Sequence, residues 1–275
     1  MNEIWRRFAS YNLWLQFEPP VGQEIFHCDM KRGFIKARKG EPEVAKLLTT
    51  ESPAMRIGHL AQRGVYEFHQ HPQMLGRIDA VEEIAEIIQL NQELAEVQER
   101  VIFILTKYHQ QPILLGKKII EFNRGDEGFP PPIFMKQGTY RFKFYAAIDC
   151  IFAEPDGTLH ILDFKTGKSD FDVRQAYLYL LAVSYLYPNK PAIASFYNLE
   201  TGKQSDPISA KANTLEAFKI EMSLIAKRHL KELKLYEDNP AEFSIIFPPN
   251  PGFNCQYCLV NSICNFSAVE LEVAA

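Results

Sequence analysis

The sequence predicts an α/β fold in which a mixed central sheet is flanked by helices. Two apolar runs at residues 140–153 and 159–164 read as strands, and the Pro-Asp-Gly turn between them reverses the chain into a hairpin. A helical pattern at residues 173–186 leads to a third apolar run at 192–198. This order of elements, together with long helical patterns before and after it, indicates a sheet with helices around it.

The elements before the hairpin are expected to be largely helical. An apolar and aromatic segment at residues 5–17 reads as a helix that ends before a pair of prolines, and an extended region surrounds Cys28. Further helices are expected over residues 55–68 and 80–108, where apolar side chains recur at helical spacing opposite mixed charges. The second of these is too short and irregular for a coiled coil.

A strand is expected at residues 113–122, and the loop GDEGFPPP follows it. Beyond the last apolar run, a Gly-Lys turn at Gly202 and Lys203 precedes another extended stretch. A long helix over residues 214–235 then leads into a proline-flanked segment rich in cysteine.

The domain organisation follows from size and from the absence of repeats or linkers. With 275 residues and 47% hydrophobic content, the chain can bury one large core and carry an accessory lobe. We expect a core over residues 51–210, an N-terminal segment 1–50 that contributes Cys28 to the lobe, and a helix with the cysteine segment at 211–275.

Three charged side chains interrupt the apolar hairpin strands: Asp149 on the first, and Asp163 and Lys165 on the second. Burying a carboxylate is costly unless a partner or a metal compensates it. A divalent cation between two carboxylates removes their repulsion, and a hard ion such as Mg²⁺ suits oxygen ligands. The alternative is a surface hairpin with solvated charges and an incidental salt bridge.

These elements resemble a known family. The strings ID at 148–149, DGTL at 156–159 and LDFKTG at 162–167 are similar to the PD-(D/E)XK nuclease superfamily, in particular its RecB-like and AddB-like branch. That branch includes the iron-sulfur nucleases associated with CRISPR adaptation. Gln175 and Tyr179 look like the Gln-x-x-x-Tyr element that follows, and on a helix they share a face. Taken alone, the pair also fits an ordinary amphipathic helix with a buried tyrosine.

The segment at residues 55–68 resembles the helix that carries a metal-site histidine in many relatives, four residues after a glycine. Counting from Gly58, that position holds Gln62, whose amide is a weaker, neutral ligand that could position a metal-bound water. His59 would reach the same site in a different helix register, although as a lone histidine it also fits a structural or surface role.

Three cysteines near the C-terminus, Cys255, Cys258 and Cys264, follow the pattern C-x2-C-x5-C. This density indicates zinc or an iron-sulfur cluster with one ligand from elsewhere. Cys28 is the better fourth ligand, since Cys150 fits a small buried hydrophobe. The resemblance implies a 4Fe-4S cluster held by these four, although Leu259 stands where relatives often have proline. Zinc and reduced cysteines in a small core are the alternatives.

Composition limits the function classes. The net charge of −4 gives no general attraction to nucleic acid, so DNA contact would depend on the metal and on local basic surface. One basic segment carries Lys31, Arg32, Lys36, Arg38 and Lys39.

No apolar run approaches the roughly 20 residues that span a bilayer. With five cysteines and no signal peptide, we expect no disulfide framework, no membrane association and a cytoplasmic location.

The resemblance implies a Mg²⁺- or Mn²⁺-dependent deoxyribonuclease of DNA repair, recombination or CRISPR-type processing, similar to the exonucleases of this branch. Asp149, Asp163 and the main-chain carbonyl of Phe164 would hold the metal, and Lys165 would orient the attacking water or stabilise the transition state. Gln62, Gln175 and Tyr179 would support the site. DNA with single strands or free ends is the implied substrate, with a helicase as a partner. The alternatives are a catalytically silent DNA-binding or assembly module and a zinc-stabilised protein that acts on something else.

Overall fold

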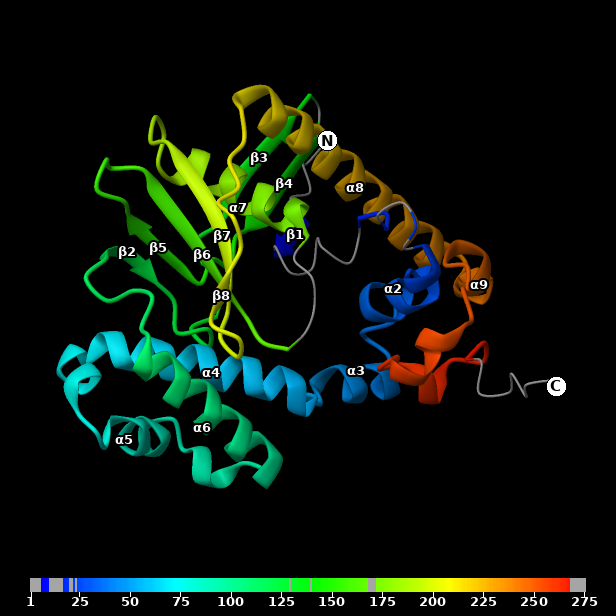
Figure 1. Ribbon diagram of the computed structural model, residues 1–275. Helices are drawn as coiled ribbons and strands as arrows, with labels where there is room; N and C mark the ends of the chain where they lie inside the picture. The colour runs from blue at the N-terminus through cyan, green and yellow to red at the C-terminus, as the bar shows by residue number, and fades with distance from the viewer. Residues whose placement is uncertain are drawn as a thin grey trace. The chain divides into compact units, whose positions relative to one another are not determined.

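The computed structural model describes residues 6–9, 17–19, 22, 24–128, 130–138, 140–167 and 172–267 (Figure 1). The chain divides into two compact units. The first combines Met1–Ser10 with Ser52–Ile220, and the second combines Tyr11–Glu51 with Glu221–Ala275. Each unit is therefore built from segments that are far apart in the sequence.

The main sheet of the first unit has five strands in the order β2-β5-β6-β7-β8. These are β2 (Lys118–Phe122), β5 (Cys150–Ala153), β6 (Leu159–Lys165), β7 (Ala192–Asn198) and β8 (Lys203–Gln204). β6 and β7 run parallel, whereas the other neighbouring pairs are antiparallel. The predicted mixed sheet is confirmed.

Helix α7 (Val173–Leu186) connects the two parallel strands, which need a crossover of this kind. Both α7 and β7 have the bounds predicted from the sequence. The side chain of Asp172 caps the helix by accepting a hydrogen bond from the Arg174 N–H at 2.9 Å. β6 is buried from Leu159 to Phe164, as expected of a central strand with both faces covered.

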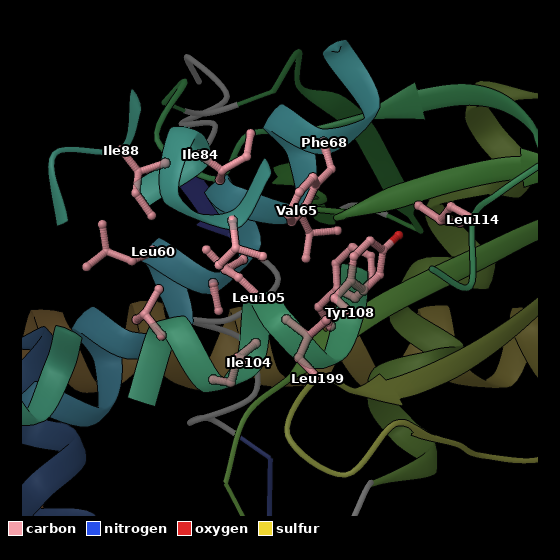
Figure 2. Close-up of a cluster of buried hydrophobic side chains, with 14 of the residues drawn as sticks. Leu60, Val65, Phe68, Ile84, Ile88, Ile104, Leu105, Tyr108, Leu114 and Leu199 are labelled. Atoms are coloured by element: carbon pink, nitrogen blue, oxygen red, sulfur yellow. The ribbon is translucent and has the colours of Figure 1, made fainter. Parts of the chain in front are cut away.

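Three helices build the main core against the sheet: α4 (Pro53–Gln70), α5 (Ala80–Ile87) and α6 (Ala95–Gln110). Figure 2 shows the apolar side chains of this cluster, in which the rings of Phe68 and Tyr108 stack with centroids 6.2 Å apart. Cys150, Leu162 and Phe164 contribute from the sheet to the same cluster. The helix expected over residues 55–68 is confirmed as part of α4, which Ser52 caps by accepting from the Met55 N–H at 3.3 Å.

The single helix expected over residues 80–108 is wrong, because the segment forms α5 and α6. Gln89 adopts a left-handed conformation with φ of 58°, and the short 3-10 helix η3 (Leu90–Gln92) follows it. Ile88 and Leu90 are buried on either side of this turn. The regular apolar spacing therefore belongs to two helices that bury one face each in the same core.

A second sheet in the same unit has three strands in the order β1-β4-β3. β1 (Arg6–Ala9) runs parallel to β4 (Tyr140–Tyr145), and β3 (Ile133–Gln137) is antiparallel to it. The helix expected over residues 5–17 is therefore wrong at 6–9; residues 5 and 10–16 lie outside the described residues. Pairing with β4 satisfies the backbone of β1 in place of helical hydrogen bonds.

The strand expected over residues 140–153 is divided between β4 and β5, which belong to different sheets. The backbone between them has other partners: the Ile148 N–H donates to the Ala146 carbonyl at 3.1 Å, and the Asn123 N–H donates to the Asp149 carbonyl at 2.8 Å. The Asn123 side chain also donates to the Ile148 carbonyl at 2.5 Å. These bonds end one ladder and place Asp149 at the start of the next.

Two predicted elements have different bounds. The strand expected at 113–122 begins only at Lys118, because the preceding residues form turns that include a hydrogen bond from the Leu115 N–H to the Pro112 carbonyl at 3.0 Å. The helix expected at 214–235 is α8 (Ala212–Asp238), which contributes its first part to the first unit and the rest to the second. Among the described helices, none combines the length and apolarity needed to cross a bilayer.

The second unit is helical where the structure describes it. Besides the end of α8 it contains η1 (Glu24–Phe26), α2 (Asp29–Lys36), α3 (Pro42–Thr49), η4 (Pro240–Glu242), α9 (Phe243–Ile246), η5 (Phe253–Tyr257) and η6 (Asn261–Ile263). Cys28 itself is extended, but it is the N-cap of α2. The core of the unit consists of Met30, Phe34, Val44, Phe243, Phe247 and Val260.

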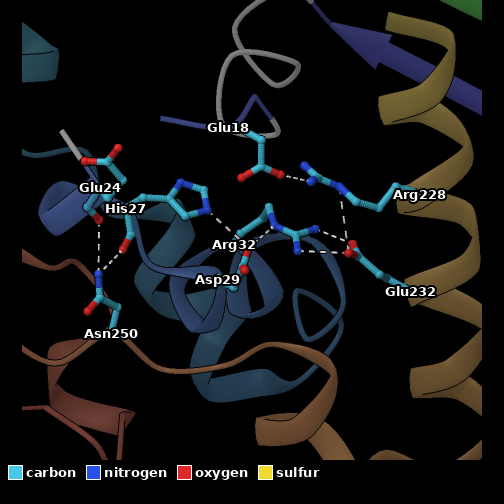
Figure 3. Close-up of polar contacts among 8 residues, drawn as sticks. All are labelled: Glu18, Glu24, His27, Asp29, Arg32, Arg228, Glu232 and Asn250. Carbon is cyan, nitrogen blue, oxygen red and sulfur yellow. Dashed lines mark hydrogen bonds and ion pairs between the residues drawn. The ribbon is translucent and has the colours of Figure 1, made fainter. Parts of the chain in front are cut away.

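An ion-pair network ties α2 to α8 within the second unit (Figure 3). The Arg32 side chain is 4% exposed; it donates to Asp29 at 2.8 Å and to Glu232 at 3.0 Å through Nη2. Arg228 pairs with Glu18 and lies 3.9 Å from Glu232. Removing one partner of such a buried pair typically costs about 3–5 kcal/mol, so Arg32 is committed to the fold.

Gly33→Ala is expected to destabilise the second unit. A Cβ at Gly33 would lie 2.6 Å from Cδ2 of Phe247 and 2.9 Å from Cζ of Phe243, two rings in the core. Alanine favours a helix by about 1 kcal/mol over glycine, but overpacking typically costs about 1–3 kcal/mol. We expect a lower midpoint in urea unfolding, whereas Gly40→Ala, where a Cβ meets nothing within 4 Å, serves as the control. A raised midpoint for Gly33→Ala would contradict this packing.

Candidate active site

The hairpin of β5 and β6 places two carboxylates together. Its turn is closed by a hydrogen bond from the Gly157 N–H to the Glu154 carbonyl at 2.9 Å, with Gly157 at φ of +86°. Cys150 pairs with Leu162, so continuing the register sets Asp149 opposite Asp163. Leu162 belongs to the main core, so alternation along β6 directs Asp163 to the opposite face, where Tyr179 of α7 contacts it, whereas Asp149 directly precedes β5 and is contacted by Gln62 of α4. The predicted hairpin is confirmed.

Asp149 is held by two hydrogen bonds. Its Oδ2 accepts from the Phe164 N–H at 2.7 Å, and its Oδ1 accepts from Nε2 of Gln62 at 3.0 Å. Burial, followed by the negative charge of Asp163, raises the pKa of Asp149 to about 7, although Lys165 and both hydrogen bonds oppose the shift. The two carboxylates are therefore close enough to repel each other.

Asp163 is 4% exposed and lies between an ammonium and a phenol. The Tyr179 hydroxyl donates to its Oδ1 at 2.8 Å, and Nζ of Lys165 lies 2.5 Å from its Oδ2. Nε2 of Gln175 donates to the Tyr179 hydroxyl at 3.2 Å. Burial, and then the charge of Asp163, raises the pKa of Tyr179 well above its usual value, so this phenol stays protonated and donates. α7 thus brings both of its predicted residues to the site.

Gln62, rather than His59, is the α4 residue that reaches the acids. Its Nε2 also donates to the Asn123 carbonyl at 3.2 Å, so both neighbours of the amide nitrogen are acceptors. The side chain lies against Gly125, where a Cβ would come within 3.1 Å of it and where φ is +94°. His59 is exposed. The sequence did not single out Asn123 or Gly125, although an Asn-x-Gly string after a strand is a turn signal.

The arrangement fits a hard divalent cation. Both acids present oxygen ligands, and Oδ2 of Asp163 is buried and accepts no hydrogen bond although Lys165 forms an ion pair with it. A cation would relieve the repulsion that raises the pKa of Asp149. Within the part of the chain that the structure describes, no group of three or more His, Cys, Asp or Glu residues is arranged to hold a metal, so any further ligands would be main-chain or solvent oxygens.

A cavity of about 300 Å³ lies at the end of β6, directly beyond Lys165. It is lined by Pro53, Ala54, Ile57, Glu96, Arg100, Thr166, Gly167 and Glu200. A Cβ on Gly58 would lie 3.4 Å from Oγ1 of Thr166, so α4 passes this cavity one helical turn before Gln62 reaches Asp149. The cavity therefore adjoins the acidic pair.

The predicted cysteine ligands lie in the second unit. All the cysteines are free thiols, and Cys150 is buried in the main core of the first unit. Burial, with smaller contributions from the charges of Cys28, Cys258 and Cys255, raises the pKa of the Cys264 thiol. The four sulfurs are thus near one another, yet among the described residues they are not arranged as a metal-binding group.

The basic segment of α2 offers less free charge than its composition indicates. Arg32 is buried in ion pairs, and the Arg38 guanidinium lies 3.7 Å from the centre of the Phe243 ring. Burial, and then the charge of Lys39, lowers the pKa of Lys36 to about 8. Arg32, Lys36 and Arg38 are thus engaged within the second unit, which leaves Lys31 and the exposed Lys39 as the local basic surface of this segment.

The thermal stability of the metal-free protein should fall between pH 4 and pH 7 because of Asp149. Its pKa is raised from 3.8 to about 7, so in this range the folded protein keeps a proton that the unfolded chain releases. The stability present at low pH is therefore lost as the pH rises through about 7. Melting curves in EDTA should show a loss of several degrees that Asp149→Asn removes. An equal slope in both proteins would contradict the raised pKa.

Comparison with known proteins agrees with this geometry. The model of the PD-(D/E)XK nuclease superfamily matches residues 32–265. No curated protein matches the chain significantly. A solved structure titled "Crystal structure of SSO0001" is 11% identical, and the match covers 86% of this chain and 94% of that one with a TM-score of 0.33. A TM-score this low supports no conclusion about fold or function.

Proposed function

The chain belongs to the PD-(D/E)XK nuclease superfamily, and on this premise we propose that it hydrolyses DNA phosphodiester bonds with bound Mg²⁺ or Mn²⁺. The observation that carries the proposal is the convergence of Asp149, Asp163 and Lys165 at one end of the hairpin. A buried pair of acids beside an ammonium has little structural value without a cation, because the two carboxylates repel each other.

Asp149, Asp163 and the main-chain carbonyl of Phe164 would hold the cation. The Phe164 N–H points to Asp149, and the carbonyl of a strand residue points to the same side as its N–H. When bound, the cation lowers the pKa of a water molecule and neutralises charge that develops on the phosphate. The two carboxylates would then both be ionised at neutral pH.

Lys165 supplies a positive charge beside this pair. Its side chain is 26% exposed, and its Nζ lies 5.7 Å from the centre of the Phe196 ring as well as against Asp163. The ammonium is therefore directed into the site. There it would orient the attacking water or stabilise the negative transition state, as a point charge beside a phosphate can.

The amide and phenol side chains would position the acids. Tyr179 donates to one oxygen of Asp163, and Gln175 fixes the hydroxyl of Tyr179 in turn. Gln62 directs its nitrogen, not its oxygen, toward Asp149. In this orientation Gln62 supports the carboxylate as a donor and is not itself a metal ligand.

The substrate and partner follow from charge and from the family. With a net charge of −4, the chain would not attract DNA through its overall charge. We therefore favour an exonuclease that receives single strands or free DNA ends from a helicase partner. Such activity belongs to DNA repair, recombination or CRISPR-type processing. We also propose a 4Fe-4S cluster on Cys28, Cys255, Cys258 and Cys264, with zinc as the alternative, on the strength of the C-x2-C-x5-C spacing and of the packing of Cys28, Cys258 and Cys264 against one small core.

The proposal is tested by digestion of labelled DNA. Linear single-stranded, linear double-stranded and circular DNA are each incubated with the protein in Mg²⁺, Mn²⁺ or EDTA. We expect cleavage of linear DNA in either metal and none in EDTA, with circular DNA resistant if free ends are required. DNA binding without cleavage in both metals would instead support a silent DNA-binding module.

A further inference from the structure

The peptide groups of Gly167 are held on both sides just beyond the candidate active site. Its N–H donates to Oε1 of Glu200 at 2.6 Å, and its carbonyl accepts from Nδ2 of Asn198 at 2.7 Å. Gly167 has φ of +82°, a conformation that favours glycine. Asn198 at the end of β7 and Glu200 in the turn after it therefore fix the turn that follows the Asp-x-Lys strand.

Glu200 is in turn fixed by α6. Its Oε2 accepts from Arg100 at 2.7 Å, and its main-chain carbonyl accepts from Nζ of Lys107 at 2.8 Å. Its N–H donates to Oδ1 of Asn198 at 3.0 Å. The carboxylate is 17% exposed, so solvent screens these interactions only partly.

The hydrogen bonds from Glu200 and Asn198 to Gly167 also restrain the main chain that carries Lys165. The Leu199 N–H donates to the Lys165 carbonyl at 2.9 Å, and the register of the parallel strands sets Lys165 opposite Asn198. Lys165 is the last residue of β6, so the direction of its side chain depends on main-chain torsions that the neighbouring turn controls. An ammonium displaced by about 1 Å can cost on the order of 10²-fold in rate.

We propose that Glu200 is a positioning residue for the reaction: by holding the N–H of Gly167 it keeps the Lys165 ammonium beside Asp163. The inference rests on the proposed nuclease function for its catalytic consequence. Its geometric part, the control of Lys165 by Glu200, is independent of whether DNA is the substrate.

The test compares Glu200→Ala and Glu200→Gln with Glu154→Ala. Glu154 lies at the other end of the hairpin, is 22% exposed and also has two partners, His160 at 2.7 Å and Lys117 at 3.1 Å. It is thus a matched control for lost hydrogen bonds. Glutamine keeps an oxygen that can accept from Gly167, so Glu200→Gln should recover most of what alanine loses.

Steady-state cleavage should separate positioning from substrate contact. We expect Glu200→Ala to lower kcat by about 10- to 100-fold, the loss typical of residues that orient a metal site, with KM changed less than about 3-fold. Glu154→Ala should keep kcat within about 2-fold of wild type even where its melting temperature falls equally. A rise in KM alone would mean that Glu200 acts as a wall of the adjoining cavity and would overturn the proposal.

A second measurement does not require cleavage. The rate at which an amine-reactive reagent labels Lys165, followed by peptide mass spectrometry at one pH, should rise in Glu200→Ala and stay unchanged in Glu154→Ala. An unchanged rate in Glu200→Ala overturns the positioning role. A raised rate in a protein that cleaves no DNA would support the role and reject only the nuclease function.

Discussion

Asp163→Ala is expected to reduce DNA cleavage by a factor on the order of 10²–10³ or more, the loss that follows removal of a charged group acting on the transition state. Asp163 holds Lys165 at 2.5 Å and accepts from Tyr179 at 2.8 Å, so the substitution removes one proposed cation ligand and the partner of the ammonium. The measurement is the rate of labelled-DNA digestion at saturating Mg²⁺ and Mn²⁺.

Two further variants separate chemistry from folding. Asp163→Asn keeps the shape and an oxygen for the Tyr179 hydroxyl, and it should be as inactive as alanine because it lacks the charge. Asp156→Asn lies in the turn of the same hairpin, where the side-chain oxygen accepts from the Thr158 N–H at 2.9 Å, and it should cleave normally. The circular dichroism spectrum of the Asp163→Ala variant should match that of the wild-type protein, which would show that the variant is folded. Undiminished cleavage by this variant would reject the assignment of the site.

If the proposed cysteine metal centre exists, Cys258→Ser is expected to abolish it and to lower the melting temperature by about 5–10 °C, since about 1 kcal/mol corresponds to a few degrees at this size. Between residues 250 and 267, Val260 is the only residue classed as buried. Besides Val260, only the partly buried Cys258, Ile263 and Cys264 of this segment pack against the core, so a four-cysteine centre would add a large share of the stabilisation of these short 3-10 turns.

The measurements are metal analysis and an absorption spectrum of protein purified without oxygen. A 4Fe-4S cluster gives a brown protein with bound iron, whereas zinc gives a colourless one, and either should be lost in Cys258→Ser. Cys150→Ala, which alters the cysteine buried in the other unit, should retain the metal. A metal-free wild type with the same melting temperature as Cys258→Ser would reject the centre.

The central part of the fold was predictable because its elements are decided locally. β7 and α7 have the expected bounds, since a buried strand is a continuous apolar run and Asp172 marks the helix start. β1 was not predictable, because its partner β4 lies more than 130 residues away in the sequence and only that pairing makes a strand of residues 6–9.

The acids of the candidate site could be placed from the sequence because a hairpin sets their register. The register of β5 and β6 brings Asp149 near Asp163, and the turn that sets this register is visible in Pro155, Asp156 and Gly157. The residues that hold the site were not visible. Glu200 follows a strand in an ordinary polar turn, and its role appears only when the parallel pairing of β6 and β7 brings it to Gly167.

The discontinuous make-up of the second unit has a consequence for biosynthesis. Met30, Phe34 and Val44 leave the ribosome about 200 residues before Phe243, Phe247 and Val260, which pack against them in the same core. At about 5–20 residues per second, the early half of this core stays uncovered for roughly 10–40 s. The nascent chain therefore exposes an apolar surface of the kind that chaperones bind during synthesis.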